Sequence, residues 1–425
     1  MPPNETKTHA DPTGTQTLET VLDRVAAGDL HAVAPGVYLL PGFGNCTIIQ
    51  GGDGVVVVDP GLFINGPRVV DALRRLTTLP VRYIIYTHGH YDHAFGTPAL
   101  LEDAAARGHA EPIIVGHANV AKRFARYRKT AGHLAETFAM QFASWGGGGG
   151  DVVRKARYCS PTLAYEDRIA LSLGDLTVEC RHGLGETDDH TWIWIPERRV
   201  IVGGDFIVSS IPNAGTPFRV QRYVLEWAET LEEMAGLEPA AVISGHGGVY
   251  TDDARAMLLT TARALRYLED EVVRRLNAGQ WYEQIVHEVD LPADLKASQY
   301  LQPVYGCPTF AVHAILRRYT GWYDGNPSML FPSPRAAVAA EVLALSGGAP
   351  AVLARARELQ GGGSIDELQL ALHLVDFVMA DSGSAVVAEA RAFKAALLDA
   401  RAKHEPSFVA RNILKSAAAL ERQRT

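Results

Sequence analysis

Four potential metal ligands lie in one short loop, and this feature constrains the fold more than any other in the sequence. His88, His90, Asp92 and His93 follow directly after the apolar run YIIYT at residues 83–87. Residues i and i+2 of an extended chain point to the same side, so we expect His88 and His90 to bind one metal ion. The turn into the next helix directs Asp92 and His93 toward a second ion.

This loop needs further ligands from elsewhere, because a catalytic zinc ion takes about three protein ligands and keeps a position open for water. Acidic or histidine residues stand where three other predicted strands end. We assign His88, His90 and Glu186 to one ion, Asp92, His93 and His246 to the other, and Asp205 as the carboxylate that bridges them. The sequence therefore predicts a dinuclear site in which seven side chains meet at strand ends.

Strands and helices occur twice in the same order. The first series is a strand meander at 33–60, a helix at 67–76, a strand at 81–86, a helix from about 97 and a mostly helical stretch at 112–145. The second is strands within 169–180, 191–196 and 199–206, a helix at 220–235 and a strand at 240–245. This repetition predicts two sheets packed face to face with helices outside, an αββα sandwich of the α/β class.

From about Asp253 onward the pattern is almost wholly helical. We therefore predict a polar N-terminal segment at 1–32, a catalytic α/β domain at 33–270 and an all-α domain at 271–425. The five glycines Gly146–Gly150 are read either as a mobile surface loop or hinge or as a loop near the site.

Composition excludes several classes of protein. The chain of 425 residues is 47% hydrophobic with a net charge of -8, and its basic residues are dispersed, which argues against nucleic acid as a partner. No apolar run of about 18 residues is present, so no membrane association is expected. The four cysteines are widely spaced and the first sixteen residues are polar, so we expect a reducing, cytoplasmic location.

The pattern H-x-H-x-D-H, followed by three distant ligands, resembles the metallo-β-lactamase superfamily across residues 33 to about 260. Most members have histidine where this sequence has Glu186, ten residues before Pro196. The alkylsulfatases of the superfamily similarly have glutamate there, although they commonly bridge the metals with glutamate rather than an aspartate such as Asp205.

The helical half resembles the same group of enzymes. Its resemblance to the alkylsulfatase dimerisation domain lies in a YG segment leading to GWYDGNP within residues 299–332, and in the stretches 368–381 and 408–422. The resemblance implies a homodimer formed through the helical domain. Alkylsulfatases also carry a sterol-carrier-like domain, which this sequence does not reach, so we do not expect recruitment of long-chain detergents through one.

The resemblance also implies roles for residues around the metals. Asp59 is expected to hold the ligand loop by hydrogen bonds. Asn213, Arg219 and Arg222 echo a family segment that holds sulfate, and of the two arginines we favour Arg219. The predicted substrate contacts are Asn45, Tyr91, Asn213 and Arg219, and the predicted catalytic residues are Asp92, Asp205, His190 and Arg219.

The mechanism that follows is hydrolysis of a small anionic ester. Two zinc ions would lower the pKa of a bound water toward about 7, and the resulting hydroxide would attack an alkyl or related sulfate ester. This ligand set also suits manganese or iron. Attack on carbon would invert a secondary alcohol, whereas attack on sulfur would retain its configuration.

Two other readings remain open. The same site could hydrolyse another ester-like substrate, namely a lactone, a β-lactam, a thioester or a phosphodiester, because one fold can support many chemistries. Alternatively, the chain could be a metal-binding scaffold without catalytic activity that uses its helical half for interaction.

Overall fold

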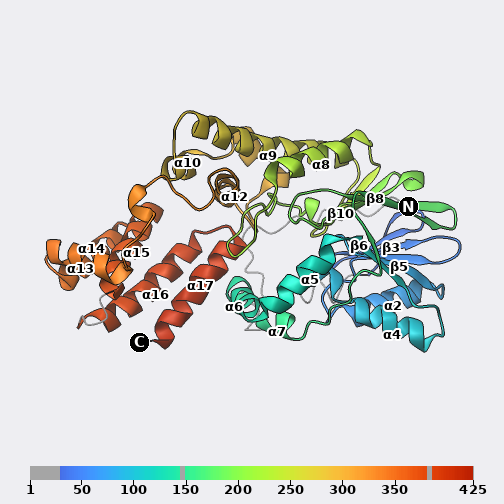
Figure 1. Cartoon of the computed structure of the whole chain (residues 1–425), viewed down its shortest axis with the longest axis horizontal. Helices are drawn as coiled ribbons and strands as arrows, with labels where there is room; N and C mark the ends of the chain where they lie inside the picture. The colour runs from blue at the N-terminus through green and yellow to red at the C-terminus, as the bar shows by residue number, and fades with distance from the viewer. Residues whose placement is uncertain (1–28, 144–148, 381–384, 425) are drawn as a thin grey trace, which may run out of the picture.

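The computed structural model describes residues 29–143, 149–380 and 385–424 (Figure 1). Two parts of the molecule are distinguished by their secondary structure. The first contains two β-sheets with flanking helices, and the second is wholly helical. The predicted fold class, a metallo-β-lactamase-like αββα sandwich followed by an all-α domain, is confirmed.

The first sheet has the order β1-β2-β3-β4-β5-β6-β7. Its strands are β1 (His31–Ala34), β2 (Val37–Leu40), β3 (Cys46–Gln50), β4 (Val55–Val58), β5 (Val81–Ile85), β6 (Ile113–His117) and β7 (Leu163–Tyr165). Strands β1 to β4 pair antiparallel, and β4 to β7 pair parallel. Parallel pairing needs crossover connections, and these supply the helices on the outer face of this sheet.

The second sheet has the order β13-β12-β11-β10-β9-β8. Its strands are β8 (Arg168–Leu173), β9 (Leu176–His182), β10 (Thr191–Ile195), β11 (Val200–Val202), β12 (Ala241–Ile243) and β13 (Val249–Tyr250). Only β11 and β12 pair parallel, across the connection that contains helix α8 (Val224–Gly236). All five residues of β10 are buried, as expected of a strand covered on both faces.

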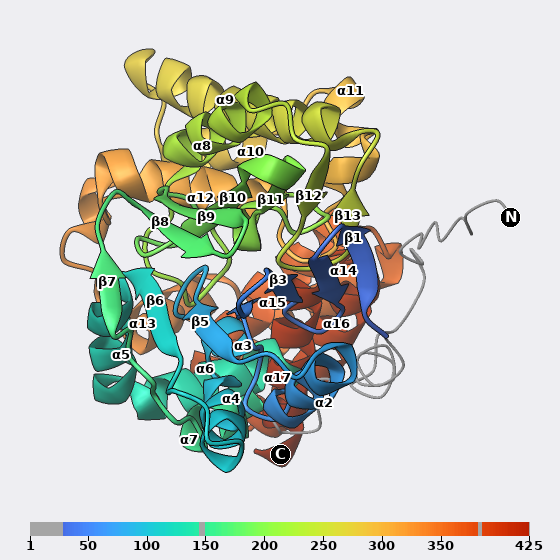
Figure 2. The same cartoon turned by 90° about the vertical axis from the view of Figure 1, so that its right-hand side faces the viewer.

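Three apolar cores hold four layers together, and Figure 2 shows the layers edge-on. Between the sheets, Ile49 and Val56 pack with Val178 and Ile193. The outer face of the first sheet packs against α2 (Gly66–Leu76), α4 (Thr97–Ala106), α5 (Asn119–Lys129), α6 (Ala131–Gln141) and α7 (Gly149–Arg154). The outer face of the second sheet packs against α8 and the long helix α9 (Ala254–Asn277).

Two details of the sequence prediction need correction. The stretch 112–145 is not mostly helical from its start, because β6 occupies Ile113–His117 in the middle of the parallel part of the sheet. The predicted domain boundary after residue 270 falls inside α9, which continues without a break to Asn277 and packs on α8. The expected N-terminal segment falls largely on residues 1–28, and Gly146–Gly148 of the glycine run also lie outside the described residues.

The helical half begins after α9. Its elements are α10 (Tyr282–Glu288), α11 (Ala293–Lys296), α12 (Pro308–Thr320), α13 (Arg335–Leu345), α14 (Ala349–Gly362), α15 (Ile365–Ala380), α16 (Val387–Lys403) and α17 (Phe408–Gln423). Helices α13 to α17 share a separate apolar core. Helix α17 returns to the first half, where Asn412 donates to the Gln141 carbonyl oxygen at 3.0 Å.

Helices long and apolar enough to cross a membrane alone are absent from the described residues. Helices α13 and α14, which meet at 86°, pass a test of length and composition only as a bent pair.

Candidate dinuclear metal site

The ligand loop begins where β5 ends and continues into the one-turn helix α3 (Tyr91–Ala94). His90 has extended backbone and precedes this helix, and its carbonyl oxygen accepts from the backbone N–H groups of His93 and Ala94 at 3.2 and 3.1 Å. The loop therefore changes from extended to helical at His90. This change separates the first pair of side chains, His88 and His90, from the second pair.

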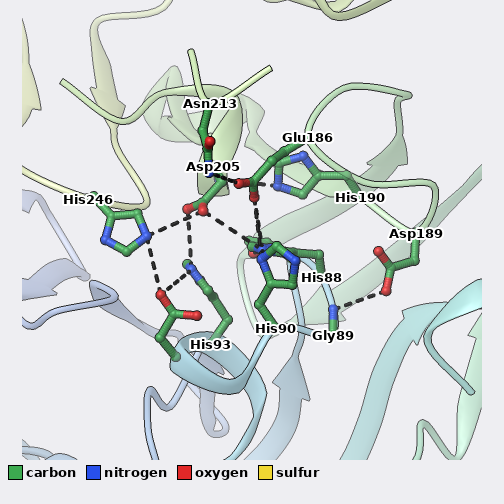
Figure 3. A network of polar contacts seen from close by, with 12 residues as sticks. His88, Gly89, His90, His93, Glu186, Asp189, His190, Asp205, Asn213 and His246 are labelled. Carbon is green, nitrogen blue, oxygen red and sulfur yellow. Dashed lines mark hydrogen bonds and ion pairs between the residues drawn. The ribbon is translucent and has the colours of Figure 1, made fainter. Parts of the chain in front are cut away.

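The first group of potential ligands is His88, His90, Glu186 and Asp205. Oε2 of Glu186 lies 3.4 Å from His88 Nε2 and 3.4 Å from His90 Nδ1. Glu186 comes from the loop between β9 and β10, so the two sheets each contribute to this group (Figure 3).

The second group is Asp92, His93 and His246. Oδ2 of Asp92 lies 3.7 Å from His93 Nε2 and 3.4 Å from His246 Nε2. His246 follows β12, so this group also joins the two sheets. The structure thus brings all seven predicted ligands together, and they divide as the sequence analysis expects.

Asp205 lies between the two groups. Its Oδ1 is 3.2 Å from His93 Nε2, and its Oδ2 is 3.3 Å from His246 Nε2 and 3.8 Å from His88 Nε2. The side chain follows β11 in a short 3-10 turn, η3 (Gly204–Phe206). One carboxylate therefore faces histidines of both groups, which is the geometry that a bridging ligand requires.

Buried polar atoms without hydrogen-bond partners show that this arrangement fits metal cations. His93 Nε2, Glu186 Oε2 and Asp205 Oδ1 are buried and have no such partner within the described part of the chain. Leaving such atoms unpaired is costly, and two cations, one in each group, would satisfy them. The donors are imidazole nitrogens and carboxylate oxygens, a set that binds divalent transition metals.

The electrostatic field at the second group favours positive charge. Burial lowers the pKa of His246, but Asp205 and Asp92 outweigh it and raise that pKa to about 9. Burial likewise opposes protonation of His93, yet Asp205, Asp92 and Asp59 raise its pKa well above the ordinary value. A field that attracts a proton to these rings also attracts a metal cation.

Asp59 holds the ligand loop from behind, as expected from the sequence. Its carboxylate accepts from the Thr87 backbone N–H at 2.8 Å and the Thr87 hydroxyl at 2.6 Å, and it contacts His93 Nδ1 at 2.8 Å. A carboxylate on Nδ1 leaves Nε2 of His93 free to face Asp205. Asp59 has a backbone φ of 53°, which is an uncommon value for a residue other than glycine.

Glu186 is held by two side chains of the loop that follows η3. Asn213 Nδ2 donates to Glu186 Oε1 at 2.9 Å, and Arg222 Nη1 donates to the same oxygen. Burial raises the pKa of Glu186, but Arg222 and the neighbouring histidines outweigh it and hold that pKa well below the ordinary value. Asn213, predicted to contact substrate, thus contacts a potential metal ligand, and so does Arg222.

Two other predicted site residues use their polar side-chain groups within the protein. Asn45 donates to the carbonyl oxygens of Ser244 and Gly247 at 2.9 and 3.0 Å, so it fixes the loop of His246 rather than offering its amide hydrogens to substrate. Tyr91 is 1% exposed, and its hydroxyl pairs with that of Tyr158 at 3.0 Å. Tyr91 nevertheless belongs to the lining of the cleft beside the site, so its substrate contact stays a prediction.

His190 lies behind the site. It is fully buried, its ring stacks on Phe206 with centroids 4.2 Å apart, and its Nε2 accepts from the Asp205 backbone N–H at 3.2 Å. The predicted catalytic role would need access to substrate, which this position does not provide. The contact instead orients the backbone of Asp205.

A buried ion pair beneath the ligand loop was missed by sequence reasoning. Asp189 Oδ2 accepts from the Gly89 backbone N–H at 3.0 Å and from Arg123 Nε at 2.8 Å. Asp189 and Arg123 are 0% and 3% exposed, so a buried pair fixes the loop at Gly89. A single sequence gives no sign that distinguishes Asp189 from its neighbour Asp188.

The site opens into a large cleft between the two halves. This cleft has a volume of about 2820 Å³, and its lining includes His90, Asp92 and His246 together with Arg219 and Tyr305. Arg219 thus lies on the wall of the cleft, and its contact with substrate stays a prediction. Tyr305, from the helical half, was not predicted.

Comparison with known families matches both halves of the chain. Residues 39–246 match the metallo-β-lactamase superfamily, and residues 282–424 match the alkyl sulfatase dimerisation family. The chain therefore combines a region similar to the metallo-β-lactamase superfamily with a second region similar to the alkyl sulfatase dimerisation family.

Curated relatives are alkylsulfatases. A linear primary-alkylsulfatase of Pseudomonas sp. is 25% identical over 327 residues, which are 72% of this chain and 61% of that protein. An (R)-specific secondary-alkylsulfatase of Pseudomonas sp. is 25% identical over 386 residues, 81% of this chain and 56% of that protein. The chain thus spans about 60% or less of the length of these two relatives.

The fold matches that of a solved structure. A stereoselective inverting sec-alkylsulfatase from Pseudomonas sp. superimposes with a TM-score of 0.81 at 22% identity, covering 97% of this chain and 70% of that one. The shared fold thus extends through both the sandwich and the helical half.

Proposed function

We propose that this protein is a dinuclear zinc hydrolase that cleaves alkyl sulfate esters to sulfate and alcohol. The observation that carries the proposal is the meeting of seven imidazole and carboxylate ligands in two groups that share Asp205. Bound divalent ions in such a site lower the pKa of water, so that hydroxide is available near neutral pH. The relatives named alkylsulfatases support the choice of substrate.

The side chains around the site have distinct tasks in this proposal. His88, His90 and Glu186 would hold one ion, Asp92, His93 and His246 the other, and Asp205 both. Arg222 and Asn213 keep Glu186 ionised and oriented toward the two histidines. Arg219 on the cleft wall presents a guanidinium group, whose planar fork binds tetrahedral oxyanions well.

We further propose that two chains associate through the helical half. The family matched by residues 282–424 supports this arrangement. Exposed apolar side chains in that half support it as well, since Phe331 and Leu345 are 92% and 88% exposed. Apolar surface of this kind is more stable when a partner covers it.

A substrate panel tests the activity. The chain is stripped with a chelator, reloaded with zinc, and assayed against a primary alkyl sulfate, a secondary alkyl sulfate, a phosphodiester, a lactone and nitrocefin. We expect sulfate release from an alkyl sulfate after zinc is restored and none from the stripped protein. If only one of the other substrates is turned over, the protein is a hydrolase of a different class. If no substrate is turned over, the remaining reading is a metal-binding scaffold without catalytic activity.

The configuration of the alcohol released from a secondary ester tests which bond breaks. Inversion indicates attack on carbon, and retention indicates attack on sulfur.

A further inference from the structure

The two groups of potential metal ligands differ in the charges that surround them. Each group has two histidines and one carboxylate of its own, Glu186 in the first and Asp92 in the second. Asp205 lies between the groups and faces histidines of both (Figure 3). Because Asp205 is shared, a difference in affinity for a cation must come largely from the charged side chains behind each group.

A buried arginine neutralises the carboxylate of the first group. Arg222 Nη1 donates to Glu186 Oε1, and both side chains are 2% exposed. With so little water around the pair, the charge of the guanidinium group is only weakly screened. Glu186 therefore presents its second oxygen, Oε2, to His88 and His90 as part of a neutral pair.

A second buried arginine lies beneath the histidines of the first group. A Cβ atom on Gly89, between these histidines, would lie 3.0 Å from Arg123 Cδ and 3.1 Å from Asp189 Oδ2. Arg123 Nε donates to the same carboxylate oxygen at 2.8 Å, so this pair is neutral as well. Arg123 also contacts Asp188, but the side chain of Asp188 is 37% exposed and its charge is screened by solvent.

The second group has two carboxylates that no basic side chain neutralises. Asp92 Oδ2 lies 3.7 Å from His93 Nε2 and 3.4 Å from His246 Nε2, and Asp59 Oδ2 lies 2.8 Å from His93 Nδ1. Within the described parts of the chain, neither Asp92 nor Asp59 forms an ion pair with an arginine or lysine. The second group therefore keeps two negative charges whose counterparts in the first group are neutralised.

We propose that the second group of ligands binds its divalent ion first and more tightly than the first group. The cause is the pair of buried arginines, Arg222 and Arg123, beside the first group. A cation bound to the second group also neutralises part of the charge of Asp205, which weakens the first group further. This inference rests on the metal-binding part of the proposed function and is independent of the substrate.

Stepwise zinc binding tests the inference. The metal-free chain is titrated with zinc in competition with a chromophoric chelator, which gives one dissociation constant for each step. We expect the two constants to differ at least about tenfold, because charge differences act strongly in a buried site. Replacing one ligand of each group assigns the steps, and His90 and His246 suit this purpose because their side chains are 17% and 24% exposed.

The variant His246→Ala should lose the tighter step and keep the weaker one. The variant His90→Ala should lose the weaker step and keep the tighter one. The reverse assignment would overturn the inference, and so would two steps of equal affinity in the wild type. Equal thermal midpoints of the metal-free proteins show that the variants are folded.

The substitution Arg222→Gln tests the cause of the difference. Glutamine offers a hydrogen-bond donor without a charge. We expect the weaker step to strengthen about tenfold and the tighter step to change less. The matched control, Arg222→Lys, keeps the charge and should not strengthen the weaker step. If both variants weaken that step alike, Arg222 acts only by orienting Glu186, and the inference is overturned.

The outcomes separate this inference from the proposed function. Unequal steps assigned as expected, without turnover of any ester, would refute the proposed function and leave the inference standing. Turnover of an alkyl sulfate by a protein with two equal zinc sites would refute the inference and leave the proposed function. A wild type that binds no zinc would overturn both.

Discussion

The carboxylate of Asp59 shows how much of the site depends on residues that are not metal ligands. It bonds to Thr87 twice and to His93 once. Asp189 fixes the same loop through Gly89. Asp59 thus holds the ligand loop at Thr87 and His93, and Asp189 holds it between them at Gly89.

We expect Asp59→Asn to weaken metal binding about 10- to 100-fold, the usual cost of removing a carboxylate that orients a ligating histidine. The amide cannot accept from both Thr87 and His93 as the carboxylate does. Competition with a chromophoric chelator measures the affinity. Asp53→Asn, in a partly exposed pair with Arg82, is the matched control, and an equal loss there would show that the effect is not specific.

The Asp189–Arg123 pair predicts a pH dependence of stability. Burial raises the pKa of Asp189, but Arg123 outweighs it and holds that pKa far below the ordinary value. An unfolded aspartate has a pKa of about 3.9, so the pair stabilises the fold fully above about pH 5. As the pH falls below about 4, the unfolded state takes up the proton first and this contribution is lost.

We therefore expect Asp189→Asn to lower the free energy of unfolding by about 2 kcal/mol at pH 7, because Arg123 keeps its contact with Asp188 but loses the charge-assisted hydrogen bond to the buried carboxylate. The difference from the wild type should shrink below about pH 4. Denaturant titrations of both metal-free proteins from pH 7 to 3 test this, and a difference that grows with acidity would contradict it.

At the scale of residues, the sequence was sufficient to predict the side chains whose own atoms can bind a metal, because histidines and acidic residues can be recognised directly at the ends of predicted strands. Residues that act through others were harder to predict. Asp189 acquires its role only from Gly89 and Arg123, 100 and 66 positions away. His190 comes four residues after the ligand Glu186, yet its buried side chain lies behind the site.

At the scale of elements, the turn after β12 must approach Asp205 very closely. A Cβ atom on Gly245 would lie 2.2 Å from Asp205 Oδ1, whereas a Cβ on Gly248 meets nothing within 4 Å. The Gly245 backbone N–H also donates to the Gly204 carbonyl oxygen at 2.8 Å. The loops after β11 and β12 are thus packed together with no space for a side chain.

Gly245→Ala should therefore displace the carboxylate of Asp205 and reduce the metal content and the hydrolytic activity at least tenfold, by analogy with loss of a positioning contact. Gly248→Ala, three residues later in the same turn, should change neither. Metal analysis after gel filtration and sulfate release provide the two measurements. Equal behaviour of the two variants would show that this close packing does not position Asp205.

Most elements were predictable because strand alternation and helical periodicity are strong in this sequence. Strand β6 was missed because Ile113–His117 is only five residues long and stands directly before two helices. Nothing within the run IIVGH distinguishes a buried parallel strand from a buried helical segment. The end of α9 at Asn277 could not be predicted either, because the helical sequence pattern continues on both sides of it.

At the scale of the whole molecule, the helical half contributes to the cleft and also presents an uncovered apolar surface. Helices α13 and α14 lie at the end of the molecule farthest from the two sheets (Figure 1). Phe331, which precedes α13, and Leu345 at its end are largely exposed. A second copy of the chain would cover them without blocking the cleft residues Arg219 and Tyr305.

We expect light scattering after size exclusion to give twice the chain mass of 46.0 kDa for the wild type. The double variant Phe331→Glu with Leu345→Glu should run as a single chain, because two buried charges would oppose association. Ile64→Glu, at a 50% exposed apolar residue of the first half, is the control. A monomeric wild type, or a dimeric double variant, would contradict this arrangement.

The central claim is that His88, His90, Asp92, His93, Glu186, Asp205 and His246 hold two divalent ions. Inductively coupled plasma mass spectrometry of the zinc-equilibrated, gel-filtered chain tests it most directly. The account predicts two ions per wild-type chain and loss of both when His88 and His93 are replaced together by alanine. A wild-type content of less than one ion, or an unchanged content in that variant, would contradict it.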